Sequence, residues 1–343
     1  MSVFNFINLF NTRMKKINIT LFLTILALSF LSRKSSAQLI PNLGGQRSGT
    51  AAVQFLKIGV GARGVGMGES FVAVANDASS LYWNPAGIAE FQQNQLFLSH
   101  NNWLVDIKHD FVGYVHHFDA TNSIGISGTA LYTNDMEETT EYQPFGTGNY
   151  FTFGDISFGL TYGRKMTDRF SFGLTLKYFR EKLAEFEMHG IMVDLGTLYW
   201  TGFGTTRFAV CVSNFGNQVK PSGSFTNRDG VKIAYFQSFS PPTIFKVGFA
   251  AELYQTAMHR LTTSVQLNHP NDNAENVNFG LEYGWREYFF LRGGYKFNVD
   301  EESFCLGGGC KVPLKIIDLS VDFAYSDFGR LGNVMRFSIL VGY

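Results

Sequence analysis

Most of the sequence alternates between apolar and small or polar residues with a period of two, and this pattern limits the fold most strongly. In the run 169–181, Leu174 and Leu176 alternate with Gly173 and Thr175. That period belongs to β-strands, whose successive side chains point to opposite faces. Most runs reach the ~9–11 residues with which a tilted strand crosses a bilayer. The fourteen runs are 94–100, 109–118, 122–133, 152–164, 169–181, 189–200, 205–214, 243–253, 258–268, 275–285, 287–297, 302–312, 315–326 and 332–343.

The connections between these runs alternate in length. The short ones are 119–121, 165–168, 201–204, 254–257, 286 and 313–314, and the longer ones are 101–108, 134–151, 182–188, 215–242, 269–274, 298–301 and 327–331. Short turns at one end, long loops at the other and an even strand count are typical of bacterial outer-membrane barrels. A β-sandwich gives no reason for this alternation. We therefore predict an all-β fold, a 14-stranded antiparallel transmembrane β-barrel.

The N-terminal residues have the features of an export signal. Met14-Lys15-Lys16 is basic, 17–31 is apolar, and Ser35-Ser36-Ala37 offers small residues for cleavage. This pattern predicts a secretory signal peptide over residues 1–37, with Met14 as an alternative start of translation. The rival interpretation, a membrane anchor, needs ~20 apolar residues.

Composition supports export to a membrane. The chain has 35 Phe and 36 Gly among 343 residues, far from an average soluble domain. Removal of five basic residues with the signal leaves a mildly acidic mature chain, so a nucleic-acid partner is not expected. The location predicted is the cell outer membrane, in contact with its lipid and lipopolysaccharide. The soluble alternative is an all-β periplasmic or secreted domain.

The three cysteines make an odd count for an exported chain. Cys305 and Cys310 are five residues apart and are expected on opposite faces of one strand. We interpret them and Cys211 as small strand residues, and a disulfide bridge stays open as an alternative.

A glycine-rich stretch, 61–89, precedes the strands and is too rich in glycine for an ordinary helix or strand. Glycine at such density suits close backbone packing that leaves no room for side chains. A short helix is expected after Asn76-Asp77, ending at Asn84 because Pro85 excludes the helical conformation there. We predict that residues 38–93 form a plug, called the hatch below, inside a barrel of residues 94–343.

Two motifs in the hatch, 62–68 (ARGVGMG) and 79–87 (SSLYWNPAG), make the chain resemble the PorV/PorQ family, a branch of the FadL-like fourteen-stranded barrels. The similarity covers nearly the whole mature chain, although only the hatch carries distinctive motifs. In that superfamily the Asn-Pro-Ala-Gly motif lies in an N-terminal hatch inside the barrel. The residues that the resemblance assigns to the hatch motif are Gly64, Gly66, Gly68, Trp83, Asn84, Pro85, Ala86 and Gly87. Asn84 is expected to hydrogen-bond to hatch or barrel backbone.

The resemblance implies an outer-membrane protein of a bacterium of the Bacteroidetes type. PorV-like proteins are accessory components of type IX secretion that bind the translocon or cargo with C-terminal signal domains. The loops 134–151 and 215–242 are then the expected partner-binding regions. The alternative is a FadL-like channel for hydrophobic small molecules, and a third interpretation is a barrel of unassigned role.

Enzyme motifs give no support for catalysis. The sequence has no His-x-x-x-His zinc pattern, Gly-x-Ser-x-Gly elbow or phosphate loop, and His116 and His117 face opposite ways on one strand. We predict no enzyme activity, no cofactor and no metal site. An acidic cluster in the loop 134–151 is interpreted as a solvated loop, with calcium binding as the alternative. Its members are Asp135, Glu137, Glu138 and Glu141.

Aromatic residues at strand ends fit the girdles of membrane interfaces. These are Tyr199, Trp200, Trp285, Tyr288 and Tyr343.

Overall fold

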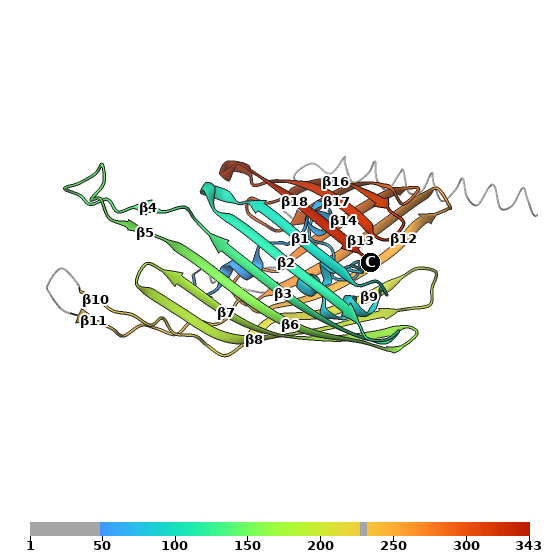
Figure 1. The fold of residues 1–343 in the computed structure, drawn as a ribbon, viewed down its shortest axis with the longest axis horizontal. Coiled ribbons are helices and arrows are strands. Elements are labelled where there is room, and N and C mark those ends of the chain that lie inside the picture. The colour runs from blue at the N-terminus through green and yellow to red at the C-terminus, as the bar shows by residue number, and fades with distance from the viewer. Residues whose placement is uncertain (1–48, 227–231) are drawn as a thin grey trace, which may run out of the picture. The chain divides into compact units, whose positions relative to one another are not determined.

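The computed structural model describes residues 49–226 and 232–343 and confirms the predicted fold class. Fourteen antiparallel strands close into a barrel, each paired with its neighbours in chain order (Figure 1). The strands are β1 (Gln95–Asn102), β2 (Lys108–His117), β3 (Asn122–Tyr132), β6 (Phe153–Thr167), β7 (Phe170–Leu183), β8 (Phe186–Trp200), β9 (Arg207–Gly216), β12 (Ile244–Gln255), β13 (His259–Pro270), β14 (Asn276–Trp285), β15 (Phe289–Phe297), β16 (Phe304–Pro313), β17 (Asp318–Asp327) and β18 (Asn333–Gly342). The predicted signal peptide, 1–37, lies outside the described residues.

Each predicted run corresponds to one barrel strand, with ends displaced by a few residues. The barrel closes between its first and last strands, where Gln95 of β1 pairs with Gly342 of β18. Closure leaves no unpaired strand edge, which a lipid environment requires of a spanning sheet.

The connection 182–188 was expected to be one of the longer loops, and that prediction is wrong. Strand β7 continues to Leu183 and β8 starts at Phe186, which leaves a two-residue turn. Arg180 and Glu187 form an ion pair across these strands, with Nε and Oε1 2.6 Å apart. The polar residues that resemble a loop are therefore strand residues in an extension of the β7–β8 hairpin.

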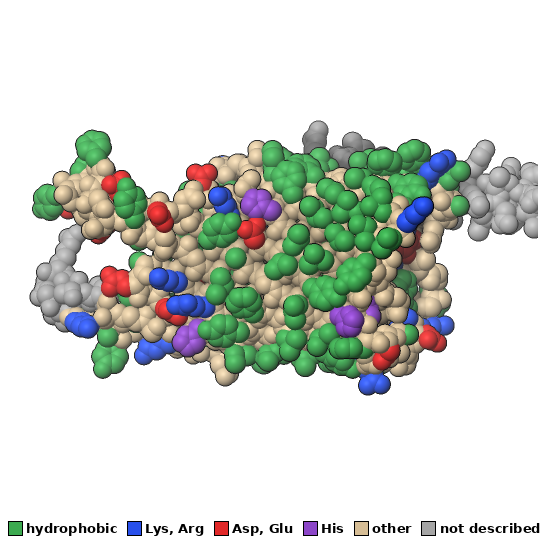
Figure 2. Space-filling view, viewed as in Figure 1, with side chains coloured by type: hydrophobic (Ala, Val, Ile, Leu, Met, Phe, Trp, Pro, Cys, Tyr) green, Lys and Arg blue, Asp and Glu red, His purple; other side chains and the backbone are tan. Residues whose placement is uncertain are grey.

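The wall has its apolar side chains outside and its polar ones inside, the reverse of a water-soluble domain. In β7, Leu176 is 51% exposed whereas Thr175 is fully buried. Figure 2 shows apolar side chains over the middle of the wall, with most charged side chains toward the two ends. An outward apolar band around a polar interior is the arrangement of a barrel that lies in lipid.

The two ends of the barrel differ, as the alternating connections predict. We call the end with the turns 118–121, 256–258 and 286–288 the short-turn end, and the other the long-loop end. Two small hairpin sheets extend the long-loop end (Figure 1). They consist of β4 (Met136–Glu137) with β5 (Tyr150–Phe151), and β10 (Phe225–Thr226) with β11 (Lys232–Ile233). Short 3-10 turns, η3 (Leu104–Asp106) and η4 (Gly329–Leu331), lie in two other loops of this end.

Residues 51–89 run through the barrel interior and are largely buried. They form η1 (Gln54–Lys57), α2 (Ala62–Gly66), α3 (Ser80–Trp83) and η2 (Pro85–Ala89). Helix α2 contacts β15 to β18, and η2 contacts β3, β6, β7 and β8, so the segment touches opposite walls. The division of the chain at residues 37 and 93 stays a prediction.

In the part of the chain that the structure describes, no helix is both long and apolar enough to cross a membrane.

Candidate functional site

The Asn-Pro-Ala-Gly motif attaches the hatch to the barrel wall. The Asn84 amide nitrogen donates to the Val72 carbonyl at 2.9 Å and to the Thr197 carbonyl of β8 at 3.2 Å. Its side-chain oxygen accepts from the Ala86 amide at 3.1 Å, which caps η2 with Pro85 in its first turn. One buried side chain therefore starts a helix and joins hatch backbone to wall backbone.

The barrel wall that faces this motif has glycines at positions where a larger residue would not fit. A Cβ on Gly196 would lie 2.1 Å from Asn84 Oδ1, and one on Gly173 would lie 2.2 Å from the carbonyl carbon of Pro85. On the hatch side, a Cβ on Gly87 would lie 2.5 Å from the carbonyl oxygen of Ala75. Since real Cβ atoms essentially never lie within 3.0 Å of another heavy atom, the motif and the wall fit only without these side chains.

The upstream glycine segment packs in the same way, although it forms the short helix α2 that its composition did not predict. A Cβ on Gly64 would lie 2.7 Å from the indole of Trp83, whose Nε1 donates to the Val60 carbonyl at 3.0 Å. Gly68 has a φ of +63°, and a Cβ there would lie 2.9 Å from the Tyr295 amide nitrogen. The lack of space at Gly66 is milder, because the nearest atom is the Cα of Gly307 at 3.1 Å.

A buried charge network holds α2 in the lumen. The Arg63 guanidinium bonds to Glu282 of β14 at 2.9 Å and to Asp77 at 2.7 Å. Glu282 also accepts from Arg292 at 2.7 Å, and Arg292 bonds to Asp322 at 2.6 Å. Burial acts to lower the pKa of Arg63, but the two carboxylates outweigh it and raise that pKa above its usual value. Arg63 is therefore a fixed positive charge that ties the hatch to the wall.

The cavities beside the hatch are polar. One of about 250 Å³ opens toward the long-loop end, and another of about 240 Å³ lies toward the short-turn end. The charged residues of the first are Lys57, Glu69, Lys246, Lys296, Asp300, Glu301 and Glu302. Those of the second are Arg63, Asp77, Arg260, Glu287, Arg292, Lys311 and Asp322. Both spaces suit water and ions better than an apolar solute.

An apolar groove lies at the long-loop end, and we call it the loop groove. It has a volume of about 630 Å³ between the β7–β8 hairpin and the loop 217–243. Its lining residues are Glu181, Leu183, Phe186, Glu187, Met188, Pro221, Phe236 and Phe239. The rings of Phe186 and Phe236 meet edge to face with centroids 5.3 Å apart, which fixes one side of the groove.

Aromatic side chains also project from the neighbouring loops. Tyr142, Phe145 and Tyr235 are each 90% or more exposed. Large apolar side chains at the membrane level face lipid, but these extend with the hairpins beyond the barrel rim (Figure 1). Exposed apolar groups in such a position mark a surface that binds a partner.

The hatch residues Ala52 and Val53 lie beside the loop groove. The Ala52 amide donates to the Ser240 carbonyl at 3.0 Å, and the Val53 amide donates to Glu181 at 2.9 Å. Phe239 and Met188 of the groove pack on the buried cluster that includes Val53. Residues that line the loop groove therefore contact the hatch directly.

The eight motif residues predicted from sequence lie in the lumen, with those of α2 and those of η2 against opposite walls, and none of them lines the loop groove. The sequence analysis predicted the loops 134–151 and 215–242 as partner-binding regions but did not identify the residues of the loop groove. Aromatic residues within the expected loops, such as Phe186 and Phe239, were the sequence signal that could have identified them.

Other residues that the sequence analysis named make hydrogen bonds within the protein. Trp200 is not part of an aromatic girdle, because its Nε1 donates to Glu90 of the hatch at 2.8 Å. Glu138 of the acidic cluster accepts from Asn149 within its own hairpin. Among the described residues, no group of three or more histidine, cysteine or acidic side chains could hold a metal. The three cysteines are unpaired, and Cys211 and Cys305 are buried.

Comparisons with known proteins agree with this architecture. The sequence model of a family described as type IX secretion system protein PorV matches residues 42–268. No curated protein matches the sequence significantly.

Solved structures with a similar fold include a FadL homologue of Pseudomonas aeruginosa, with a TM-score of 0.56, 12% identity, and coverage of 83% of this chain and 98% of that chain. The toluene transporter TodX of Pseudomonas putida has a TM-score of 0.54, 10% identity and coverage of 83% and 97%. The toluene transporter TbuX of Ralstonia pickettii has a TM-score of 0.51, 12% identity and coverage of 83% and 97%. At these identities the similarity shows the fold alone.

Proposed function

Because the chain belongs to the PorV family of type IX secretion system proteins, we propose that it is a non-enzymatic partner-binding barrel of the bacterial outer membrane. In this role it is an accessory component of type IX secretion. It binds the translocon, or cargo proteins through their C-terminal signal domains, at the long-loop end. The hatch residues Gly64, Gly66, Gly68, Trp83 and 84–87 act as the structural plug behind that surface.

The loop groove is the observation that carries this proposal. Its lining is mostly apolar, and Leu183 at its rim is 51% exposed. A groove of this kind, at the same end of the barrel as the projecting rings of Tyr142 and Phe145, supplies the aromatic and aliphatic anchors that dominate protein interfaces.

The alternative, a channel for hydrophobic molecules, receives less support from the lumen. A solute passing from the long-loop end would meet the charged cavity around Lys246 and Lys296. It would then meet the buried Arg63–Glu282 pair and a hatch packed backbone to backbone against the wall. Breaking such contacts costs more than an apolar solute gains from a polar cavity.

A pull-down from the native outer membrane in mild detergent tests the proposal. The tagged wild type is expected to recover a very large translocon barrel or proteins with C-terminal secretion domains, identified by mass spectrometry. Leu183→Asp is expected to reduce that recovery about tenfold, the effect of losing one hot-spot residue. Phe203→Ser is the matched control, because Phe203 is 83% exposed at the short-turn end.

Recovery of the barrel alone, together with bound apolar small molecules, would contradict the proposal and favour the channel. Equal losses for Leu183→Asp and Phe203→Ser would show that the loop groove is not the binding surface.

A further inference from the structure

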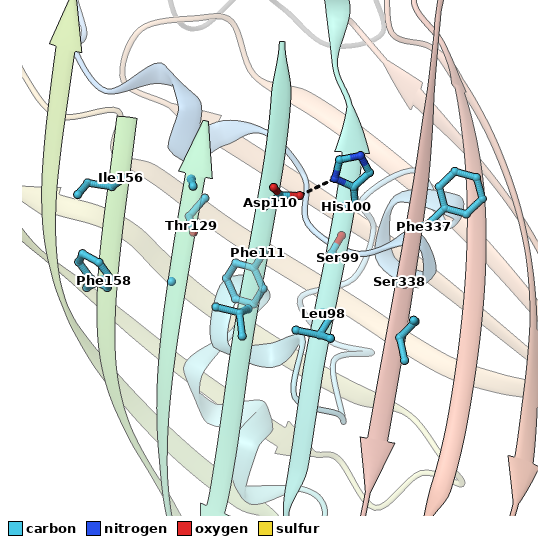
Figure 3. A pocket seen from close by; sticks show the side chains of 14 residues that line it. Leu98, Ser99, His100, Asp110, Phe111, Thr129, Ile156, Phe158, Phe337 and Ser338 are labelled. Atoms are coloured by element: carbon cyan, nitrogen blue, oxygen red, sulfur yellow. Dashed lines mark hydrogen bonds and ion pairs between the residues drawn. The ribbon is translucent and has the colours of Figure 1, made fainter. Parts of the chain in front are cut away.

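A second groove lies on the outside of the barrel wall, and we call it the wall groove. It has a volume of about 450 Å³. Ile156 and Phe158 of β6 form one side, and Phe337 of β18 forms the other (Figure 3). Between them the outward-facing residues of β3 are Gly128 and Ala130, whose small side chains leave the groove open.

The wall groove is apolar along most of its length and polar at one end only. That end carries His100 and Asp110, whose Nδ1 and Oδ1 atoms are 2.6 Å apart. Asp110 also accepts from the Tyr132 hydroxyl at 2.8 Å. Both side chains of the pair are more than a third exposed on a surface that otherwise faces lipid. Ionisable groups on a lipid-facing surface are costly, and they mark functional positions.

The polar end lies toward the long loops. His100 is two residues from the last residue of β1, Asn102, whereas Leu98 and Val112 line the groove one row nearer the membrane centre. In Figure 3, His100 and Asp110 lie above Leu98 in the same way. A molecule with its polar group at this end and its apolar part below has the orientation of an outer-leaflet lipid.

The charge at the polar end favours an anionic group. Lys108 lies one row further out, paired in register with Asn102 and Tyr132. Both ring nitrogens of His100 are engaged, by Asp110 at 2.6 Å and by Asn102 at 3.2 Å. Asp110, the acidic member, is engaged by His100 and Tyr132. Lys108 is therefore the basic group that remains for a phosphate.

We propose that the wall groove binds a phosphorylated lipid of the outer leaflet, with one acyl chain over Gly128 and Ala130 and its phosphate at Lys108. The volume lies within the ~300–1,000 Å³ of small-molecule sites and suits one chain. This site is separate from the loop groove, and it depends only on the barrel lying in the outer membrane.

Native mass spectrometry of the full-length, detergent-purified chain tests the site, with bisphosphorylated lipid A and phosphate-free lipid A as probes. The wild type is expected to bind one phosphorylated molecule about tenfold more tightly than the phosphate-free form. Gly128→Leu fills the groove and is expected to weaken the binding of both probes about tenfold. Lys108→Gln is expected to weaken only the phosphorylated probe.

The groove-filling variant has a matched control. A Cβ on Gly128 would have Val112 Cγ1 at 3.4 Å as its nearest neighbour, so the leucine extends outward without straining the wall. Gly293→Leu makes the same change on β15, where the nearest atom is Leu306 Cδ2 at 3.9 Å. Lys315→Gln in the turn between β16 and β17 controls for charge at the short-turn end. Heat-dependent gel mobility verifies that each variant has a folded barrel.

Equal lipid binding by Gly128→Leu and Gly293→Leu would overturn the proposal, as would equal affinity of the wild type for both probes. A change in self-association or in translocon recovery for Gly128→Leu, with lipid binding unchanged, would also overturn it and would assign the wall groove to a protein contact.

Discussion

The docking of the hatch on the wall can be tested at Gly173. A Cβ at this position of β7 would lie 2.2 Å from the Pro85 carbonyl carbon and 2.4 Å from the Ala86 nitrogen. Both neighbours are backbone atoms at the start of η2, so no side-chain rotation relieves the contact. Gly173→Ala must push this part of the hatch away from the wall by more than an ångström.

Two terms give the size of the effect. Overpacking a filled interior costs about 1–3 kcal/mol. Displacement of η2 also stretches the bond from Asn84 to the Thr197 carbonyl, already 3.2 Å long, and a lost hydrogen bond costs about 0.5–1.5 kcal/mol. A total of about 3 kcal/mol raises the population of the undocked hatch about a hundredfold.

Hydrogen exchange measured by mass spectrometry on the detergent-solubilised chain reports this population. The amides of residues 84 and 86–89 are expected to exchange about a hundredfold faster in Gly173→Ala, with the strands β13 to β17 unchanged. Gly163→Ala is expected to have a smaller effect, because its Cβ would meet the Ile88 side chain, which can rotate. Gly308→Ala is the control, since its nearest neighbour is the Phe290 carbonyl at 3.8 Å.

Equal exchange of the amides of residues 84 and 86–89 in Gly173→Ala and Gly308→Ala would refute the reasoning. It would mean that the glycines of the wall do not determine how closely the hatch docks.

Three further substitutions test the network around the hatch and one turn. Asn84→Ala leaves three backbone partners without their bonds and is expected to destabilise hatch docking by about 2–4 kcal/mol, measured by the same exchange experiment. Glu282→Gln removes the charge shared by Arg63 and Arg292 and is expected to lower the free energy of unfolding by about 3 kcal/mol, measured by denaturant titration. Hydrogen bonds from its own turn lower the pKa of Asp119 below that of the unfolded chain. The contribution of Asp119 to the free energy of unfolding is therefore full above about pH 4 and is lost as the pH falls below that value. Asp119→Ala is expected to remove this part of the acid dependence of the melting temperature.

The strand pattern was predictable because one local rule, alternation with a period of two, acts on each barrel strand. The rule failed between residues 182 and 188, where charged residues resemble a loop. Arg180 and Glu187 face water from strands that extend past the apolar band, so their polarity reports solvent and not a break in the sheet. A sequence pattern separates inside from outside, but it does not show where the lipid stops.

The sequence predicted that the hatch glycines pack closely, but it did not predict which residues they contact. Glycine-rich hatch residues indicated close packing, but their partners are strand glycines distant in sequence, such as Gly294 opposite Gly68. Which pairs meet depends on how the hatch turns inside the closed barrel, and no local rule fixes that. Trp200 is different, because adjacent strand residues face opposite ways and Tyr199 is outward, so its inward position was available from sequence.

The two ends of the hatch are held by different kinds of contact, and this links the plug to the surface above it. Near the short-turn end, glycine packing and Asn84 join backbone to backbone. At the long-loop end the chain turns through Val53, a β-branched residue with a φ of +58°, which stores strain of about 1–3 kcal/mol. The bond from Val53 to Glu181, a loop-groove residue, helps hold that strained turn. A strained hatch residue, Val53, is therefore bonded directly to the surface that we propose as the binding site.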